Sequence, residues 1–169
     1  AGLAVFDVEE LPTHGGSLRV FAQRLDTGRR IRSLRVSDLL KREKEAGMLG
    51  PDFYAGFQER ADKVKNDFLA FLLQMKREGK RVTAYGAAAK GNTLLNYAGV
   101  RPDLIPFVVD RNPAKQGKYL PGSRIPVVGE ERLKESKPDC IVILPWNLRE
   151  EVMAQLAYAG AWGARFITA

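Results

Sequence analysis

The sequence contains one cysteine and one histidine among its 169 residues. A single cysteine cannot form an internal disulfide, and one cysteine with one histidine cannot supply the ligands of a structural zinc site. No apolar run approaches the roughly 20 residues that cross a bilayer, and the first residues lack the pattern of a signal peptide. These absences predict no metal site and no membrane partner, and they favour a cytoplasmic location.

Hydrophobic residues make up 45% of the chain and charged residues 28%, a composition that predicts one globular domain with a modest extension. The net charge of +7 is concentrated in residues 24–42, which hold seven basic residues and two acids. No aromatic residue interleaves with this cluster, so the base-stacking surface of a single-strand binder is missing. We interpret the segment as a solvated connector or a docking face rather than a ligand site, and we expect no nucleic-acid partner.

The N-terminal residues are predicted to form a strand pair, over residues 3–9 and 17–25, joined by Pro-Thr-His-Gly-Gly. A lone pair of strands is marginal in water. The pair therefore predicts that its sheet is completed by polypeptide outside this sequence.

Two helices are expected next, one from Ser37 to residue 45 and a longer one over 51–78, whose apolar residues recur at steps of three and four. The expected organisation is a strand pair at 1–25, a basic helical connector at 26–50 and a C-terminal domain at 51–169.

From residue 81 onward, short apolar runs alternate with helical patterns. The predicted strands are 82–85, 105–110, 127–128, 140–144 and 165–168, and the predicted helices are 93–97, 130–135 and 148–159. This alternation indicates an α/β fold: a Rossmann-like, doubly wound, mostly parallel sheet with flanking helices.

A glycine-containing junction follows the first of these strands. Gly86, Ala88 and Gly91 occupy the three glycine positions of G-x-G-x-x-G, and Asp110 ends the next strand, about where a ribose-binding acid lies. A helix that begins at this junction would favour an anion at its N-terminus. Dinucleotide binding is one interpretation, and a tight turn that needs only small residues is the other.

The same junction lacks the signature of a triphosphate-binding loop. Asn92 stands where that loop requires a lysine after its second glycine, followed by Thr93, and Lys90 is displaced by two positions. ATP or GTP hydrolysis is therefore not expected.

Two polar loops follow strands whose carboxyl ends form the ligand-binding crevice of such a sheet. Lys115 in the first loop is a candidate for a diphosphate, Trp146 in the second for stacking on a base or sugar, and Asn147 for a hydroxyl. Ordinary turn chemistry is the alternative for Asn112-Pro113 and Pro145-Trp146. The candidate substrate-binding residues of this region are Gly86, Ala88, Lys90, Gly91, Asn92, Thr93, Asp110, Asn112, Lys115, Trp146 and Asn147.

His14, the only histidine, is the one candidate for imidazole acid–base chemistry. Gly15, Gly16 and Ser17 beside it offer N–H groups and a hydroxyl to an oxygen-rich ligand, and we count them as substrate-binding candidates. A structural histidine in a surface loop is the alternative. Serine hydrolysis is excluded because Arg19 stands where G-x-S-x-G requires glycine.

Three segments occur in an order that resembles the C-terminal part of the sugar C-methyltransferases. They are FDVEELPTHGGSLR at 6–19, YGAAAKGNT at 85–93 and VDRNPAKQG at 109–117. The resemblance covers nearly the whole chain. Members of that family join a zinc-binding module, an S-adenosylmethionine domain and a C-terminal Rossmann-like domain, and they methylate a carbon of a nucleotide-linked deoxysugar.

The resemblance implies that this chain is a fragment that contributes one wall of the site for a nucleotide-diphosphate sugar and is not catalytic alone. It implies that S-adenosylmethionine and zinc belong to the full-length enzymes, that this chain binds neither, and that the strand pair closes the missing methyl-donor domain. His14 would then position sugar or phosphate oxygens, and oligomerisation is possible. A stand-alone NAD-binding or sensing module and a purely structural or oligomerisation domain are the alternatives.

Overall fold

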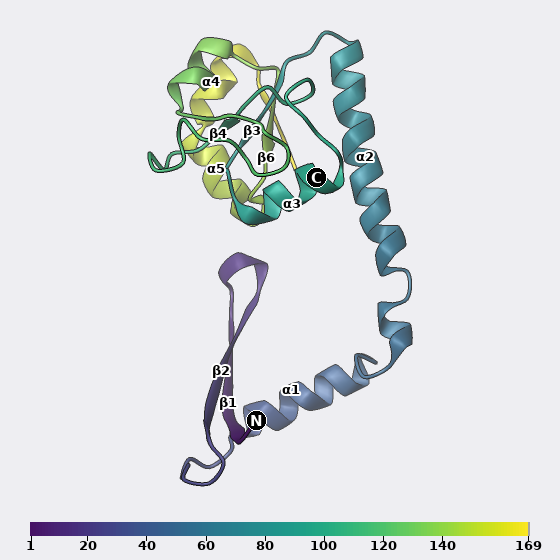
Figure 1. The fold of residues 1–169 in the computed structure, drawn as a ribbon, viewed down its shortest axis with the longest axis vertical. Helices are drawn as coiled ribbons and strands as arrows, with labels where there is room; N and C mark the ends of the chain where they lie inside the picture. The colour runs from purple at the N-terminus through teal and green to yellow at the C-terminus, as the bar shows by residue number, and fades with distance from the viewer. Residues whose placement is uncertain (169) are drawn as a thin grey trace. The chain divides into compact units, whose positions relative to one another are not determined.

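The computed structural model describes residues 1–168, so the last residue of the predicted region 51–169 lies outside it. The chain divides into two compact units, Ala1–Gln58 and a C-terminal unit that begins at Glu59 (Figure 1). Each unit is described by itself.

The N-terminal unit contains the expected strand pair. Strands β1 (Leu3–Leu11) and β2 (Ser17–Arg24) pair antiparallel around the short 3₁₀ turn η1 (Thr13–Gly15). Helix α1 (Leu34–Glu45) packs on the pair, where Val8 and Val36 are buried, and the 3₁₀ helix η2 (Pro51–Tyr54) follows.

Two ion pairs connect α1 to strand β1. Arg35 pairs with Asp7, and Arg42 pairs with Glu10 at 2.8 Å. The Ser33 hydroxyl also donates to Asp7 Oδ1 at 2.6 Å. Hydrogen bonding from Arg35 and then from Ser33 lowers the pKa of Asp7 below its ordinary value.

The predicted start of α1 at Ser37 is wrong. The helix begins at Leu34 with Ser33 in the N-cap position, in an extended conformation. Ser33 takes this position because its hydroxyl bonds across to the strand pair, a contact that the local sequence does not reveal.

The C-terminal unit is built on a five-stranded parallel sheet in the order β5-β4-β3-β6-β7. The strands are β3 (Val82–Tyr85), β4 (Val108–Val109), β5 (Val127–Val128), β6 (Cys140–Ile143) and β7 (Arg165–Ile167). This topology confirms the predicted α/β fold class.

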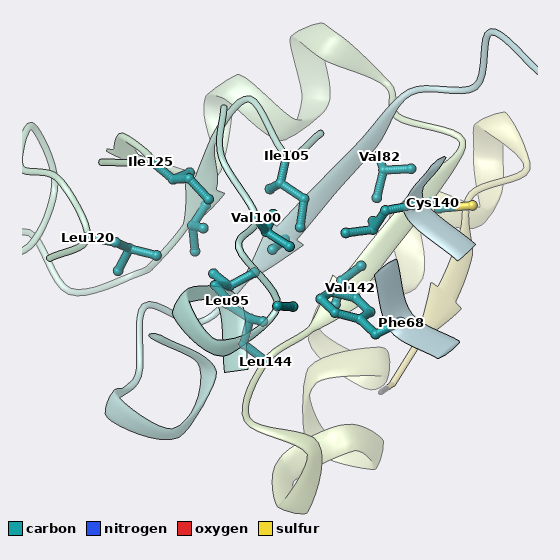
Figure 2. Close-up of a cluster of buried hydrophobic side chains, with 14 of the residues drawn as sticks. Phe68, Val82, Leu95, Val100, Ile105, Leu120, Ile125, Cys140, Val142 and Leu144 are labelled. Atoms are coloured by element: carbon teal, nitrogen blue, oxygen red, sulfur yellow. The ribbon is translucent and has the colours of Figure 1, made fainter. Parts of the chain in front are cut away.

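Helices cover both faces of this sheet. They are α2 (Phe57–Arg77), α3 (Ala89–Tyr97), α4 (Glu131–Ser136) and α5 (Arg149–Gln155), with the 3₁₀ helices η3 (Trp146–Leu148) and η4 (Ala157–Trp162). On one face, Val82 and Val142 pack with Phe68 of α2 and Leu95 of α3 (Figure 2). On the other face, side chains of the intervening strand positions pack with α4 and α5. Successive side chains of β3 and β6 point to opposite faces of the sheet, and helices cover both faces. Every residue of these two strands is therefore buried.

A loop covers the outer edge of β5. The N–H of Gly117 donates to the Val127 carbonyl at 2.9 Å, and the N–H of Val127 donates to the Lys118 carbonyl at 2.8 Å. Tyr119 and Pro126 form an antiparallel bridge beside them. The segment that follows β4 therefore belongs to the sheet as well as to the surface.

The predicted strand at 105–110 is only Val108–Val109 in the structure. Pro106 has no N–H to donate to a ladder, and the N–H of Ile105 is used in a turn with the Arg101 carbonyl at 3.2 Å. Ile105 is nevertheless fully buried, so its apolar character reflects the core rather than a strand.

Three helix boundaries also differ from expectation. Helix α3 begins at Ala89 rather than Thr93, so Gly91 lies inside it. The predicted helix at 51–78 is interrupted at Gly56, which has a φ of 73°, and the one at 148–159 gives way to 3₁₀ geometry after Gln155. Gly56 interrupts a predicted helix, whereas Gly91 lies inside a helix. The sequence alone does not show which of these roles a glycine has.

Candidate functional site

The carboxyl ends of β3 and β6 form the point where the strand order reverses. From β3 the chain continues to β4 on one side, and from β6 it continues to β7 on the other. Ligands of open α/β sheets bind in the crevice outside such a switch point. Gly86 follows β3 there, and Leu144 and Pro145 follow β6.

Close packing explains the two glycines of the junction. Gly86 has a φ of 92°, and a Cβ at this position would lie 2.5 Å from Pro145 Cδ. A Cβ on Gly91 would lie 2.5 Å from Leu144 Cβ. The turn and the first part of α3 therefore rest directly on the end of β6, in accord with the small-residue interpretation of the motif.

Helix α3 begins immediately after this turn. Ala88 occupies the N-cap, and its N–H donates to the Gly86 carbonyl at 2.8 Å. Lys90, Asn92 and Thr93 therefore lie on the helix rather than in a loop, and the Thr93 hydroxyl donates within it to the Ala89 carbonyl at 3.1 Å. The N–H groups of the first turn of a helix point outward and attract anions.

Lys90 of α3 and Trp146 of η3 are in contact. The Lys90 ammonium nitrogen lies 5.4 Å from the centroid of the Trp146 ring, a cation–π contact. Trp146 is 43% exposed, and the half-buried Asn147 follows it in η3. An accessible indole beside a cation and a helix N-terminus suits a ligand with both an aromatic ring and an anionic group.

Asp110 is almost buried, and its carboxylate is used within the chain. Oδ1 accepts the N–H of Asn112 at 2.9 Å, while Oδ2 accepts the N–H of Ala87 at 2.8 Å and the Lys115 ammonium at 3.0 Å. Lys115 also donates to the Ala87 carbonyl at 3.0 Å. These bonds argue against Asp110 as a free ribose ligand and assign Lys115 an internal partner.

The loop after Asp110 is held by further hydrogen bonds. Asn112 Oδ1 accepts the N–H of Ala114 at 3.0 Å, the turn chemistry that its sequence suggested. Gln116 Nε2 donates to the Asp110 carbonyl at 2.9 Å. Sequence reasoning missed Gln116, because nothing in the local pattern indicates that its side chain folds back to the strand end.

The histidine loop belongs to the N-terminal unit and the Gly86 region to the C-terminal unit, so the two sets of candidates lie in separate bodies. His14, Gly15 and Gly16 have φ values of 57°, 83° and 119°. The Ser17 hydroxyl donates to the Thr13 carbonyl at 2.9 Å and accepts from the Thr13 hydroxyl at 3.1 Å. The Ser17 hydroxyl is therefore occupied by hydrogen bonds within the turn. The exposed His14 has a left-handed backbone conformation, which non-glycine residues seldom adopt.

Two tyrosines with shifted pKa values, Tyr85 and Tyr158, pack with α4 and α5 on one face of the sheet, and Tyr85 directly precedes Gly86. Burial, and then the charge of Glu130, raise the pKa of Tyr85. Burial raises the pKa of Tyr158 further, helped by its 2.7 Å hydrogen bond to Glu130. Burial is the first cause of both pKa shifts, so the shifts do not mark either tyrosine as a reactive group.

The junction does not fit S-adenosylmethionine as a resident cofactor, because the acid that would take its ribose is engaged with Ala87, Asn112 and Lys115. No group of three histidine, cysteine, aspartate or glutamate residues that could hold a metal ion occurs between residues 1 and 168. Within the same residues, no helix has the length and apolar composition needed to cross a membrane.

Comparison with known proteins agrees with the resemblance of the three segments. Residues 12–169 match the family model described as the C-methyltransferase C-terminal domain. The chain is 34% identical over 166 residues to C-methyltransferase NovU of Streptomyces niveus, an alignment that covers 98% of this chain and 39% of that protein. The chain thus spans well under half the length of this relative. It belongs to the family of C-methyltransferase C-terminal domains.

Proposed function

We propose that this domain forms one wall of the nucleotide-sugar site in an S-adenosylmethionine-dependent sugar C-methyltransferase. The observation that carries the proposal is the pairing of Lys90 with Trp146 at the switch point of the sheet. The indole would stack on the base, and the first turn of α3, with Lys90, would face the diphosphate. Asn147, next to Trp146, would hydrogen-bond a sugar hydroxyl.

The strand pair supplies the second part of the proposal. Leu3, Val5, Leu18 and Val20 are between 41% and 61% exposed, although they lie on strands. A cavity of 560 Å³ beside α1 is lined largely by apolar side chains of the pair and the helix. Two strands with an uncovered apolar surface are marginal alone. We propose that the methyl-donor domain covers this surface and that β1 and β2 complete its sheet.

In this arrangement the chain binds and orients the substrate, and the methyl donor lies outside the residues described here. S-adenosylmethionine would supply the methyl group to a carbon next to the sugar's keto group, after that carbon loses a proton. His14, held in its turn, would position sugar or phosphate oxygens. The chain alone would bind nucleotide without transferring a methyl group.

A titration of the ¹⁵N-labelled chain with thymidine 5′-diphosphate tests the binding role. We expect shifts of the amide signals of residues 88–92 and of the Trp146 indole N–H. The indole N–H of Trp162 donates to the Pro138 carbonyl at 3.0 Å, and its signal should stay unchanged as an internal control. If a saturating concentration of thymidine 5′-diphosphate shifts neither the amide signals of residues 88–92 nor the indole signal of Trp146, the proposed site is contradicted.

Thermal-shift measurements with NAD and thymidine diphosphate separate the remaining interpretations. The nucleotide-sugar role predicts stabilisation by thymidine diphosphate alone. Stabilisation by NAD would instead favour a dinucleotide-binding module. No stabilisation by either, with full activity of the intact enzyme after Trp146→Ala, would favour a structural domain.

A further inference from the structure

Asp110 connects three parts of the C-terminal unit that are distant in sequence. Its carboxylate binds the glycine turn through the Ala87 N–H and the following loop through the Asn112 N–H and Lys115. Its own N–H donates to the Val128 carbonyl at 3.0 Å, which ties it to β5. The Asp110 side chain is 12% exposed, so its carboxylate is largely shielded from water.

Lys115 completes this connection from the loop side. Its ammonium group bridges Asp110 Oδ2 and the Ala87 carbonyl, each at 3.0 Å. Both polar groups of the Ala87 backbone are therefore held, the N–H by Asp110 and the carbonyl by Lys115. Ala87 lies two residues before the first residue of α3, so this clamp sets the direction in which the helix begins.

The other side of the turn is fixed by packing. Gly86 rests on Pro145, the residue before Trp146. A change in the position of Ala87 would therefore move the first turn of α3, and Lys90 with it, relative to the indole. A displacement of about 1 Å is enough to weaken a positioned ligand contact strongly.

We propose that Asp110 and Lys115 are positioning residues of the substrate site: they do not contact the nucleotide but hold the first turn of α3 in the orientation that binds its diphosphate. This inference rests on the proposed function. It assigns Lys115 a role different from the direct diphosphate contact that its sequence position suggested. The buried acid at the end of β4 then serves the chain's own backbone instead of a ribose.

The test compares variants of the chain by the dissociation constant for thymidine 5′-diphosphate and by amide hydrogen exchange at Ala87. Lys115→Met removes the ammonium group, and Asp110→Asn replaces one acceptor oxygen by an amide. Each should raise the dissociation constant about tenfold or more, and each should also speed exchange at Ala87. Lys115→Arg, which keeps the charge and the donors, should restore most of the affinity.

Lys76→Met is the matched control. Lys76 pairs with Asp103 at 3.0 Å, the same distance as in the Lys115–Asp110 pair, but both side chains are more than half exposed. The control removes an equal charge from the same unit and should leave the dissociation constant unchanged. A similar loss in Lys76→Met and Lys115→Met would show a general charge effect and overturn the inference.

The wild-type titration separates the two ways to fail. If the wild-type chain binds thymidine diphosphate and Lys115→Met binds equally well, the positioning role is wrong and the proposed function stands. If the wild-type chain does not bind, the proposed function fails and the inference falls with it. Should Asp110→Asn not fold, Lys115→Met decides through both readouts, because weaker binding together with faster amide exchange at Ala87 is expected only if Lys115 holds the turn. The Lys115 side chain is 42% exposed, so this variant leaves no buried cavity.

Discussion

The position that a Cβ of Gly91 would occupy lies 2.5 Å from the Cβ of Leu144. Real Cβ atoms do not approach this closely, so glycine is required for α3 to pack on the end of β6. The contact fixes the separation between α3, which carries Lys90, and the chain just after β6, two residues before Trp146.

Gly91→Ala should therefore destabilise the C-terminal unit despite the higher helix propensity of alanine. Overpacking of a buried contact costs about 1–3 kcal/mol, against a propensity gain of up to about 1 kcal/mol. Urea unfolding followed by circular dichroism measures the difference. Gly160→Ala is the control, since nothing lies within 4 Å of its added Cβ. Equal midpoints for the two variants would contradict the packing argument.

Leu72 and Leu73 offer a matched pair on α2. Leu72 is 1% exposed in the core and Leu73 is 38% exposed. Leu72→Ala should lower the free energy of unfolding by about 2–5 kcal/mol through lost burial and a cavity. Leu73→Ala removes the same atoms from a half-exposed position and should cost much less. Similar losses in the two variants would mean that α2 packs differently from the description above.

Trp146→Ala should weaken binding of thymidine diphosphate. Stacking of a base on an aromatic side chain contributes about 1–3 kcal/mol, so the dissociation constant should rise by roughly 5- to 150-fold. Isothermal titration calorimetry measures it. Trp162→Phe changes the other tryptophan, which packs with Tyr158, and should leave the affinity unaltered. An unchanged affinity in Trp146→Ala would remove the indole from the site.

The junction between strand β1 and α1 should weaken in acid. The pKa of Asp7 is lowered in the folded chain by Arg35 and Ser33, so the stabilisation is complete above the pKa of the unfolded state. It is lost as the pH falls through the lower pKa of the folded state. A carboxyl-carbon NMR titration should give Asp7 a midpoint below that of an exposed aspartate. Arg35→Gln should move the midpoint upward, and an unshifted midpoint in the wild-type chain would contradict the ion pair.

The sequence patterns that predicted the sheet are local, which explains their success. Strands β3 and β6 are mostly apolar and are buried on both faces, and helical patterns separate the strands, so a doubly wound sheet follows. The predicted strand at 105–110 overlooked Pro106, although the effect of a proline on strand pairing is a local one. The start of α3 could not be predicted in this way. The reason for a glycine at position 91 is its close contact with Leu144, which is more than fifty residues away in the sequence.

The candidate site was predicted less completely than the fold. The switch-point rule directs attention to the residues after β3 and β6, and the contact of Lys90 with Trp146 joins two of them. The partners of Asp110 could not be predicted, since an acid at a strand end has the same sequence pattern whether it faces a ribose or a backbone N–H. Only the folded loop decides between them.

The loop that carries Asn112 and Lys115 continues into the segment that pairs with β5 through Gly117 and Lys118. An unpaired edge strand is a template on which other chains can add. A shortened loop would therefore do more than alter the crevice: it would uncover a row of hydrogen-bonding groups at one end of the sheet. Such a deletion should promote self-association, so this one segment links the solubility of the domain to the shape of its proposed binding site.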